Sequence, residues 1–349
     1  MDKAKIGCLF LLFTFPLFIG CSDTKKEEDL REAVLKATET GQWNTAAQLS
    51  EQLYKRNPDD AEANYEAATN YLRLNYPDKA LAILNSFKNS TKKQDTEVGK
   101  RDARTAKAYY MTRQYSRVLE VAANYTYPKM YRGLAREHLK ALIRLGKFEE
   151  LSTYLEAYRQ SGIFRENGKA TNTDFLFKAV LNELILVKND TLVASYAQRF
   201  QQWVSKNQSG SDALRNKSYI SFYLKDYELA KMSLQSAIKE EQSLRHLIEL
   251  EMLLGVCYAK TGDFEKAEMQ IRKIHSMDDL PPRHDAFGAK FYNQARIEAA
   301  MRRKKAAMQS LKKALENNAA FWSYKFKEDG FLVPLFGWPP FEELVKPKG

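Results

Sequence analysis

One pattern recurs along the chain: a helical segment with small residues, a short break that often contains Gly or Asp, an aromatic residue, and a small residue three positions later. The segment 248–280 shows it most clearly, with Gly255 and Tyr258 before the break and Phe264 and Ala267 after it. Runs of alternating β-branched residues, which would indicate strands, are missing between the segments. The pattern predicts an all-α protein.

The small residue after the break recurs with a period close to 34 residues, which is the length of one helical hairpin. Its position falls at 46, 80, 118, 151, 194, 230, 267 and 307, with the larger Val and Leu at 118 and 151. The spacing predicts about eight hairpins within residues 30–318. The segment 175–207 fits the pattern least well.

These blocks resemble the tetratricopeptide repeat, in which a large residue precedes Gly or Ala, Tyr follows, and a Gly-x-aromatic step leads to Ala. The positions that carry the resemblance are Gly41, Trp43, Ala46, Ala68, Tyr71, Ala80, Gly146, Phe148, Gly255, Tyr258, Gly262, Phe264 and Ala267. The resemblance implies an α-solenoid (superhelix) of tetratricopeptide-like hairpins.

The residue types have a physical reason in such an array. Gly or Ala lets the two helices of a hairpin approach closely, and the aromatic residue after the turn is expected to fill the gap to the next hairpin. Each hairpin buries its apolar face only against its neighbours, so the last one needs a cover. Residues 319–349, with Asp329-Gly330 and a Trp338-Pro339 step, are expected to cap the array by packing over the final hairpin.

The N-terminus has a different pattern. Lys3 and Lys5 precede an apolar run over residues 6–19, which is the layout of a secretory signal peptide. The sequence Phe18-Ile19-Gly20-Cys21 resembles the lipobox of bacterial lipoproteins, so residues 1–20 are expected to be removed and Cys21 to carry the lipid, palmitate included. The alternative is cleavage after Gly20 without lipidation. Residues 21–29 are expected to be a polar tether. Ser22 directly after the cysteine resembles lipoproteins that are sorted to the outer membrane, so we expect the protein there, on the periplasmic face or at the cell surface.

The positive charge is concentrated in the third and fourth repeats. Residues 100–147 contain twelve Lys or Arg and three acidic residues, a balance of +9 in a chain with net charge +11. By the resemblance, positions on the inner helix of each repeat line a concave groove, here Lys100, Lys107, Tyr110, Arg136, Lys140 and Arg144. Such a groove would suit an extended acidic peptide or polymer. The alternative is ordinary solvated charge.

Motifs for catalysis are missing from the sequence. The four histidines are His138, His246, His275 and His284, without a His-Glu-x-x-His helix or a cysteine pair, and no phosphate loop or nucleophile elbow occurs. We therefore expect no enzyme activity, no metal and no cofactor. Nucleic acid is not an expected partner of an exported protein.

The sequence thus predicts a membrane-anchored scaffold lipoprotein that mediates protein–protein interactions in the bacterial cell envelope. Its expected partners are envelope proteins or peptides, acidic ones among them, and the membrane through the lipid. Two alternatives stay open. One is a surface lipoprotein that binds glycans or nutrients, and the other is an enzyme whose site is assembled from dispersed residues.

Overall fold

The computed structural model describes residues 17–86, 95–125, 130–160, 173–277, 288–317 and 323–348. In these ranges the chain forms helices and no strands. Sixteen helices pair into eight hairpins, which confirms the predicted fold class. The hairpins are α1 (Leu17–Glu39) with α2 (Trp43–Arg56), α3 (Ala61–Arg73) with α4 (Pro77–Ser86), α5 (Asp95–Met111) with α6 (Tyr115–Ala123), α7 (Arg132–Arg144) with α8 (Phe148–Gln160), α9 (Thr173–Leu186) with α10 (Asp190–Asn207), α11 (Gly210–Tyr223) with α12 (Tyr227–Glu240), α13 (Leu244–Lys260) with α14 (Phe264–Ser276), and α15 (Ala289–Ala300) with α16 (Lys304–Glu316).

All eight hairpins share one turn. In each, a residue with left-handed φ, between 58° and 83°, lies two positions after the end of the first helix, and these residues are Gly41, Asn75, Arg113, Gly146, Lys188, Lys225, Gly262 and Arg302. The next amide donates back to a carbonyl five residues earlier, for example from Asp263 to Tyr258 at 2.9 Å. This is the Schellman arrangement, which satisfies carbonyls at a helix end that would otherwise lack partners.

The second helix then begins in the same register each time. The amide at the marker position donates to the carbonyl four residues earlier, as Ala267 does to Asp263 at 3.1 Å. Seven of the predicted markers are completely buried, at 46, 80, 118, 151, 230, 267 and 307. The fifth is wrong by one residue, because Val193 donates to Asn189 and is buried while Ala194 is only half-buried.

The other signature residues mostly lie where close packing needs them. Ala68 is completely buried, Tyr71 and Tyr258 are nearly so, and a Cβ on Gly255 would lie 2.6 Å from the Cδ1 atom of Ile297 in the next hairpin. Trp43 is buried, with the Arg73 guanidinium 4.8 Å from its ring centre. The expectation that the aromatic residue after each turn fills a gap is wrong for Phe264, which is 46% exposed because it lies at the outer end of α14.

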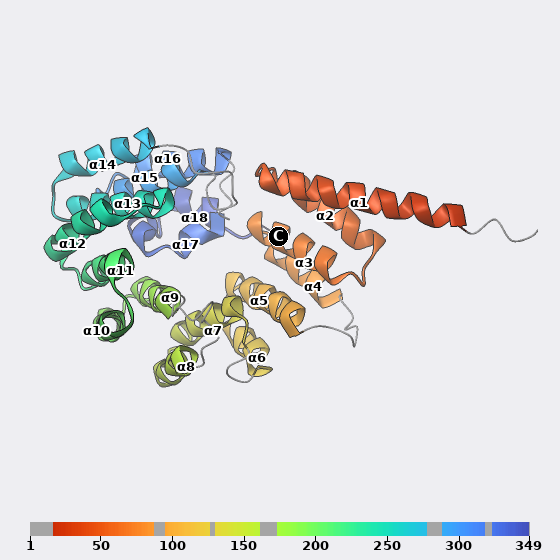
Figure 1. Cartoon of the computed structure of the whole chain (residues 1–349), viewed down its shortest axis with the longest axis horizontal. Coiled ribbons are helices and arrows are strands. Elements are labelled where there is room, and N and C mark those ends of the chain that lie inside the picture. Colours follow the sequence, from red (N-terminus) through yellow and green to blue (C-terminus); the bar gives the residue numbers. More distant parts are fainter. Residues whose placement is uncertain are drawn as a thin grey trace, which may run out of the picture.

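The hairpins stack into a curved superhelix, as Figure 1 shows. The first helices follow one another on the inner side, where α3, α5, α7 and α9 are in contact in turn. Inside the curve lies the C-terminal strap, by which we mean residues 323–348. It consists of α17 (Ser323–Lys327), the 3-10 helix η1 (Gly330–Leu335) and α18 (Pro339–Val345).

The strap packs against the last hairpin and also reaches the second. Phe326, Leu332, Leu335 and Phe341 are completely buried in one apolar cluster with residues of α15 and α16. At its far end, the strap meets the turn between α3 and α4, where Asn75 donates to the Lys346 carbonyl at 2.8 Å and accepts from the Lys348 amide at 2.8 Å. The strap therefore spans the inner side of the superhelix.

Helix α1 begins at Leu17, so residues 21–29, predicted as a polar tether, are helical and continue into the first hairpin. Arg31 in this helix pairs with Glu27 at 2.9 Å and also with Asp60 of the α2–α3 turn. The first sixteen residues, most of the predicted signal peptide, lie outside the described ranges. Among the helices described, none combines the length and apolarity that crossing a membrane requires.

Candidate functional site

The strap crosses the inner side of α5 and α7, where the predicted groove residues Lys107 and Lys140 lie. Lys107 on α5 places its Nζ atom 2.6 Å from both carboxylate oxygens of Glu328, and Lys140 on α7 donates to the same carboxylate at 2.9 Å. Lys107 and Lys140 are 3% and 5% exposed. Since an isolated charge is costly to bury, these three groups stabilise the folded state only as a set.

A second carboxylate, Glu137 of α7, completes this set. It accepts from Lys140 at 2.9 Å and from Arg136 at 2.6 Å, and it is completely buried. Burial on its own would raise the pKa of Glu137 and of Glu328, but the neighbouring cations, Lys107 and Lys140 foremost, lower both below the ordinary value. Both groups are therefore carboxylates at neutral pH.

Arg144 and Tyr110 belong to an adjacent buried group around Glu183 of α9. The Tyr110 hydroxyl donates to Glu183 at 2.5 Å, and the Arg144 guanidinium pairs with the same carboxylate. Burial and the Glu183 charge raise the pKa of Tyr110 well above its usual value. Tyr324 of the strap donates to the Tyr110 carbonyl at 3.4 Å, so this group too lies beneath the strap.

The prediction of an open basic groove therefore needs correction. The groove lined by Lys107, Tyr110 and Lys140 is occupied by the chain's own acidic segment, and these three residues are buried. The physical reason is that Glu328 supplies in cis the negative charge that the sequence led us to expect from a partner. Of the other predicted groove residues, Lys100 is exposed, and Arg136 and Arg144 are partly exposed.

Sequence reasoning missed the residues that hold the strap. Asn182 of α9 donates to the Glu328 carbonyl at 2.5 Å and accepts from the Gly330 amide at 2.8 Å. Arg296 of α15 donates to Asp329 at 2.7 Å. Asp329-Gly330 was noted only as part of a cap, and no signal in the sequence links it to residues on α9.

The inner surface of the second and third hairpins carries a polar patch. We call Tyr65, Thr69, Lys100 and Arg104 the N-terminal inner patch. Arg104 donates to the Thr69 hydroxyl at 3.0 Å and to the Tyr65 hydroxyl at 2.9 Å, and its guanidinium lies 5.1 Å from the Tyr65 ring centre. Lys100 precedes Arg104 by one helical turn and is exposed. The patch presents a positioned guanidinium and a lysine to the solvent, because Arg104 is also partly exposed.

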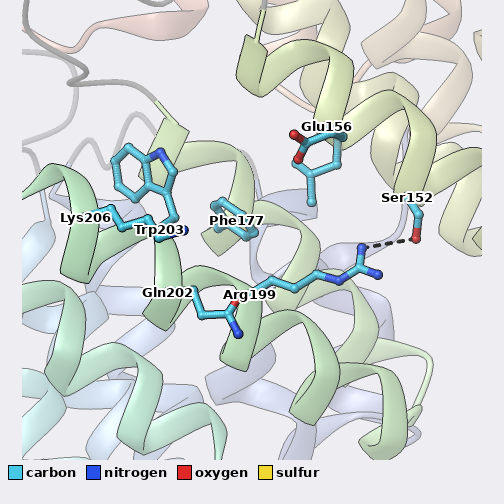
Figure 2. Close-up of a pocket in the computed structure, with 8 residues that line it drawn as sticks. Ser152, Glu156, Phe177, Arg199, Gln202, Trp203 and Lys206 are labelled. Atoms are coloured by element: carbon cyan, nitrogen blue, oxygen red, sulfur yellow. Dashed lines mark hydrogen bonds between the residues drawn. The ribbon is translucent and has the colours of Figure 1, made fainter.

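A cavity of 380 Å³ lies between the fourth and fifth hairpins, as Figure 2 shows. Phe177 of α9 and Trp203 of α10 form its apolar wall, with ring centres 6.4 Å apart, and Arg199 donates to Ser152 across it at 3.4 Å. The Ser152 and Tyr196 hydroxyls also form a hydrogen bond of 2.7 Å. The serine is thus held between a tyrosine and an arginine.

The described histidines serve packing and hydrogen bonding. His138 lies edge-on against Tyr154, and burial lowers its pKa to about 4. His246 is 2.9 Å from an Arg215 nitrogen, and His275 is 2.8 Å from Gln294. His284 lies outside the described residues. In the ranges that the structure covers, no group of His, Cys, Asp and Glu is arranged to hold a metal ion.

Stacked helical hairpins that share one turn and form a curved array define an α-solenoid. Residues 37–99 match the family model described as tetratricopeptide repeat. The chain accordingly contains tetratricopeptide repeats in that segment, within an all-α helical-repeat superhelix. Arrays of this kind bind protein partners in general, and they are generally not enzymes.

No curated protein matches the sequence. Similar solved structures include a tetratricopeptide repeat protein from Parabacteroides merdae, which is 13% identical, with a TM-score of 0.41 and coverage of 92% of this chain and 98% of that chain. The APC/C hetero-tetramer Cut9–Hcn1 is 15% identical, with a TM-score of 0.37 and coverage of 94% of this chain and 72% of that chain. Yeast Tom70 is 10% identical, with a TM-score of 0.37 and coverage of 93% of this chain and 81% of that chain.

Proposed function

We propose that this protein is a scaffold lipoprotein that holds protein partners and is anchored by an acylated Cys21 in the outer membrane of the bacterial envelope. The observation that carries the proposal is the N-terminal inner patch, because it places Lys100, the exposed residue of the predicted basic groove, beside the positioned guanidinium of Arg104. Two hydroxyls fix the Arg104 guanidinium, so little side-chain freedom is lost when it binds a carboxylate.

The patch would bind an acidic or carboxylate-bearing segment of the partner. Lys100 and Arg104 lie one turn apart on α5, so an extended peptide that runs across the inner helices could meet both. Exposed charges of this kind raise the association rate and favour acidic partners over basic ones. Membrane attachment would concentrate the array near envelope proteins.

Affinity capture from envelope membranes tests the partner site. The wild-type protein is compared with a variant carrying Lys100→Glu and Arg104→Glu, and bound proteins are identified by mass spectrometry. The matched control carries Lys239→Glu and Lys312→Glu, which reverse two exposed lysines on the outer helices α12 and α16. We expect the wild type and the control to recover the same defined envelope proteins, and the patch variant to lose them. Equal recovery from all three would contradict the proposed site.

Labelling with an alkynyl palmitate analogue tests the anchor. The wild-type protein should incorporate the label and sediment with membranes, whereas a Cys21→Ser variant should do neither. A labelled Cys21→Ser protein, or an unlabelled wild type, would refute the lipoprotein assignment without affecting the capture experiment.

A further inference from the structure

A cavity of 340 Å³ remains on the inner side of the superhelix next to the strap. We call it the inner pocket. Its walls come from α7, α9, α11, α13 and α15 on one side and from residues 325–331 of the strap on the other. Its volume falls in the range of small-molecule sites in proteins. The pocket exists because the strap closes the superhelix without filling it.

Positive charge predominates in the lining. Five cations and three carboxylates border the inner pocket, a balance of +2, and they are Arg136, Lys140, Lys178, Arg296, Lys325, Glu249, Glu328 and Asp329. The two strap carboxylates are already engaged, since Glu328 pairs with Lys107 and Lys140, and Asp329 pairs with Arg296. These ion pairs hold two cations of the wall, Lys140 and Arg296, together with the two carboxylates, so the balance of +2 belongs to the lining as a whole.

Aromatic rings form the rest of the wall, and cations lie against several of them. The Lys178 ammonium is 4.3 Å from the Tyr219 ring centre, and Arg296 is 5.2 Å from that of Phe331. Arg136 lies 5.7 Å from the Phe175 ring centre. Flat apolar surfaces with a cation beside them suit a ligand that has a flat apolar part and an anionic part.

We propose that the inner pocket binds a small organic anion, a carboxylate or a phosphate ester that carries a flat apolar group. Lys178 and Lys325 would contact the anion, and Tyr219, Phe331 and Phe175 would contact the flat group. Lys325 is exposed within the pocket, so an entering anion can reach it. This inference does not depend on the scaffold function or on the N-terminal inner patch.

Proton binding should be coupled to ligand binding. Desolvation of the ammonium inside the pocket, together with the nearby Arg296 and Arg136 charges, lowers the pKa of Lys325 to about 7, although Asp329 and Glu328 oppose the shift. A bound anion adds negative charge, which raises this pKa. Below pH 7 the ammonium is already formed, whereas above pH 7 the complex must take up a proton, so affinity should fall as the pH rises from 6 to 8.5.

Fluorine NMR of the purified full chain tests the proposal with three probes. They are 4-fluorobenzoate, 4-fluorophenyl phosphate and the neutral 4-fluorobenzamide, which has nearly the shape of the benzoate. We expect saturable broadening of one or both anion signals and none of the amide signal. The stronger anion tells whether the pocket prefers a carboxylate or a phosphate.

Three substitutions assign the site. Lys178→Gln and Lys325→Gln should each weaken anion binding by roughly tenfold, the effect of one charge-assisted hydrogen bond. Lys327→Gln, on the same short helix but outside the pocket, should leave the affinity for the anion unchanged. Circular dichroism checks that each variant is folded. Equal broadening by the neutral amide, no saturable binding, or anion binding that both pocket variants retain would overturn the proposal.

Discussion

At the scale of single residues, Glu328 is the residue that joins the strap to the array. Its carboxylate reaches Lys107 on α5 and Lys140 on α7, and its carbonyl accepts from Asn182 on α9. Lys107 and Lys140 lie 33 positions apart in sequence, close to one repeat period, so equivalent positions of successive inner helices converge on one acid. One residue thereby ties three repeats to the C-terminal strap, two through its side chain and one through its backbone carbonyl.

The substitution Glu328→Gln should destabilise the protein strongly. The amide keeps the shape but removes the charge, which leaves Lys107 and Lys140 buried with only Glu137 to balance them. Removing one partner of a buried ion pair typically costs about 3–5 kcal/mol. Urea denaturation followed by circular dichroism measures the loss. The control, Glu343→Gln on the exposed side of α18, should change the free energy of unfolding by under about 0.5 kcal/mol.

Acid should act on the same group. The pKa values of Glu328 and Glu137 are lowered in the folded protein from an ordinary value of 4.5. Their contribution to stability is therefore present above pH 4.5 and is lost as the pH falls through the folded-state values. For the wild type, the urea concentration at the unfolding midpoint should decrease as the pH falls below 4.5. For Glu328→Gln it should decrease less. Parallel curves for the two proteins would show that other carboxylates govern the acid response.

Lys325 should react with acylating reagents at neutral pH far more readily than other lysines. With a pKa of about 7, about half of it is unprotonated at pH 7, whereas an ordinary lysine is unprotonated to roughly one part in a thousand. Brief labelling with dilute acetic anhydride from pH 6 to 10, with peptide mass spectrometry, yields the titration curve. Exposed Lys239 and Lys346 serve as internal references. A Lys325 curve that coincides with theirs would contradict the expected shift.

At the scale of the helix pair, the shared turn explains why some repeats were obvious and others were not. Gly occupies the left-handed position in three turns, at 41, 146 and 262, and these gave the clearest Gly-x-aromatic motifs. Elsewhere Arg113, Lys188, Lys225 and Arg302 adopt the same φ, at a cost of about 1–2 kcal/mol each. The Schellman hydrogen bonds hold them there, so the turn persists where its sequence signal does not.

Close packing between hairpins makes Gly255 sensitive to a single methyl group. In Gly255→Ala the new Cβ would lie 2.6 Å from the Cδ1 atom and 3.0 Å from the Cγ1 atom of Ile297. Overpacking of this kind typically costs about 1–3 kcal/mol. The double variant Gly255→Ala with Ile297→Val removes the Cδ1 atom and should recover part of that loss, after subtraction of the cost of Ile297→Val alone. Unfolding in urea measures all four proteins, and strictly additive effects would show that the two residues do not collide.

At the scale of the whole molecule, the strap converts an open superhelix into a closed one. It is buried against the last hairpin through Phe326, Leu332 and Phe341, and it is tied to the second hairpin through Asn75. Figure 1 shows it on the inner side, with the C-terminus near α3. In an isolated solenoid each repeat contacts only its neighbours. Here contacts between distant repeats also pass through the strap.

Deletion of residues 337–349 should open the molecule. It removes α18 and the hydrogen bonds between Asn75 and residues 346 and 348 but keeps Glu328 and η1. The second hairpin then keeps only the hydrogen bond from Asn75 to Ser323, at 3.2 Å, as its tie to the strap. Small-angle X-ray scattering should show a larger radius of gyration, and the lost burial of Phe341 should cost at least about 3 kcal/mol. Removal of Gly349 alone is the control. An unchanged radius of gyration in a folded deletion variant would mean that the strap does not hold the curvature.

The sequence by itself determined the local structure: an all-α chain, eight hairpins and seven of the eight buried marker positions. It could do so because a period of about 34 residues and small residues at helix contacts are properties of each repeat. It also placed an excess of positive charge on the inner face of α5 and α7 and an acidic step in the tail at Glu328-Asp329. Only the tertiary structure brought these two together. They are about 190 to 220 residues apart in sequence, as for Lys140 and Lys107 from Glu328, and no local pattern records which surface a tail will cover. The curvature that all the repeats produce together decides whether a charged side chain contacts a partner or another part of its own chain.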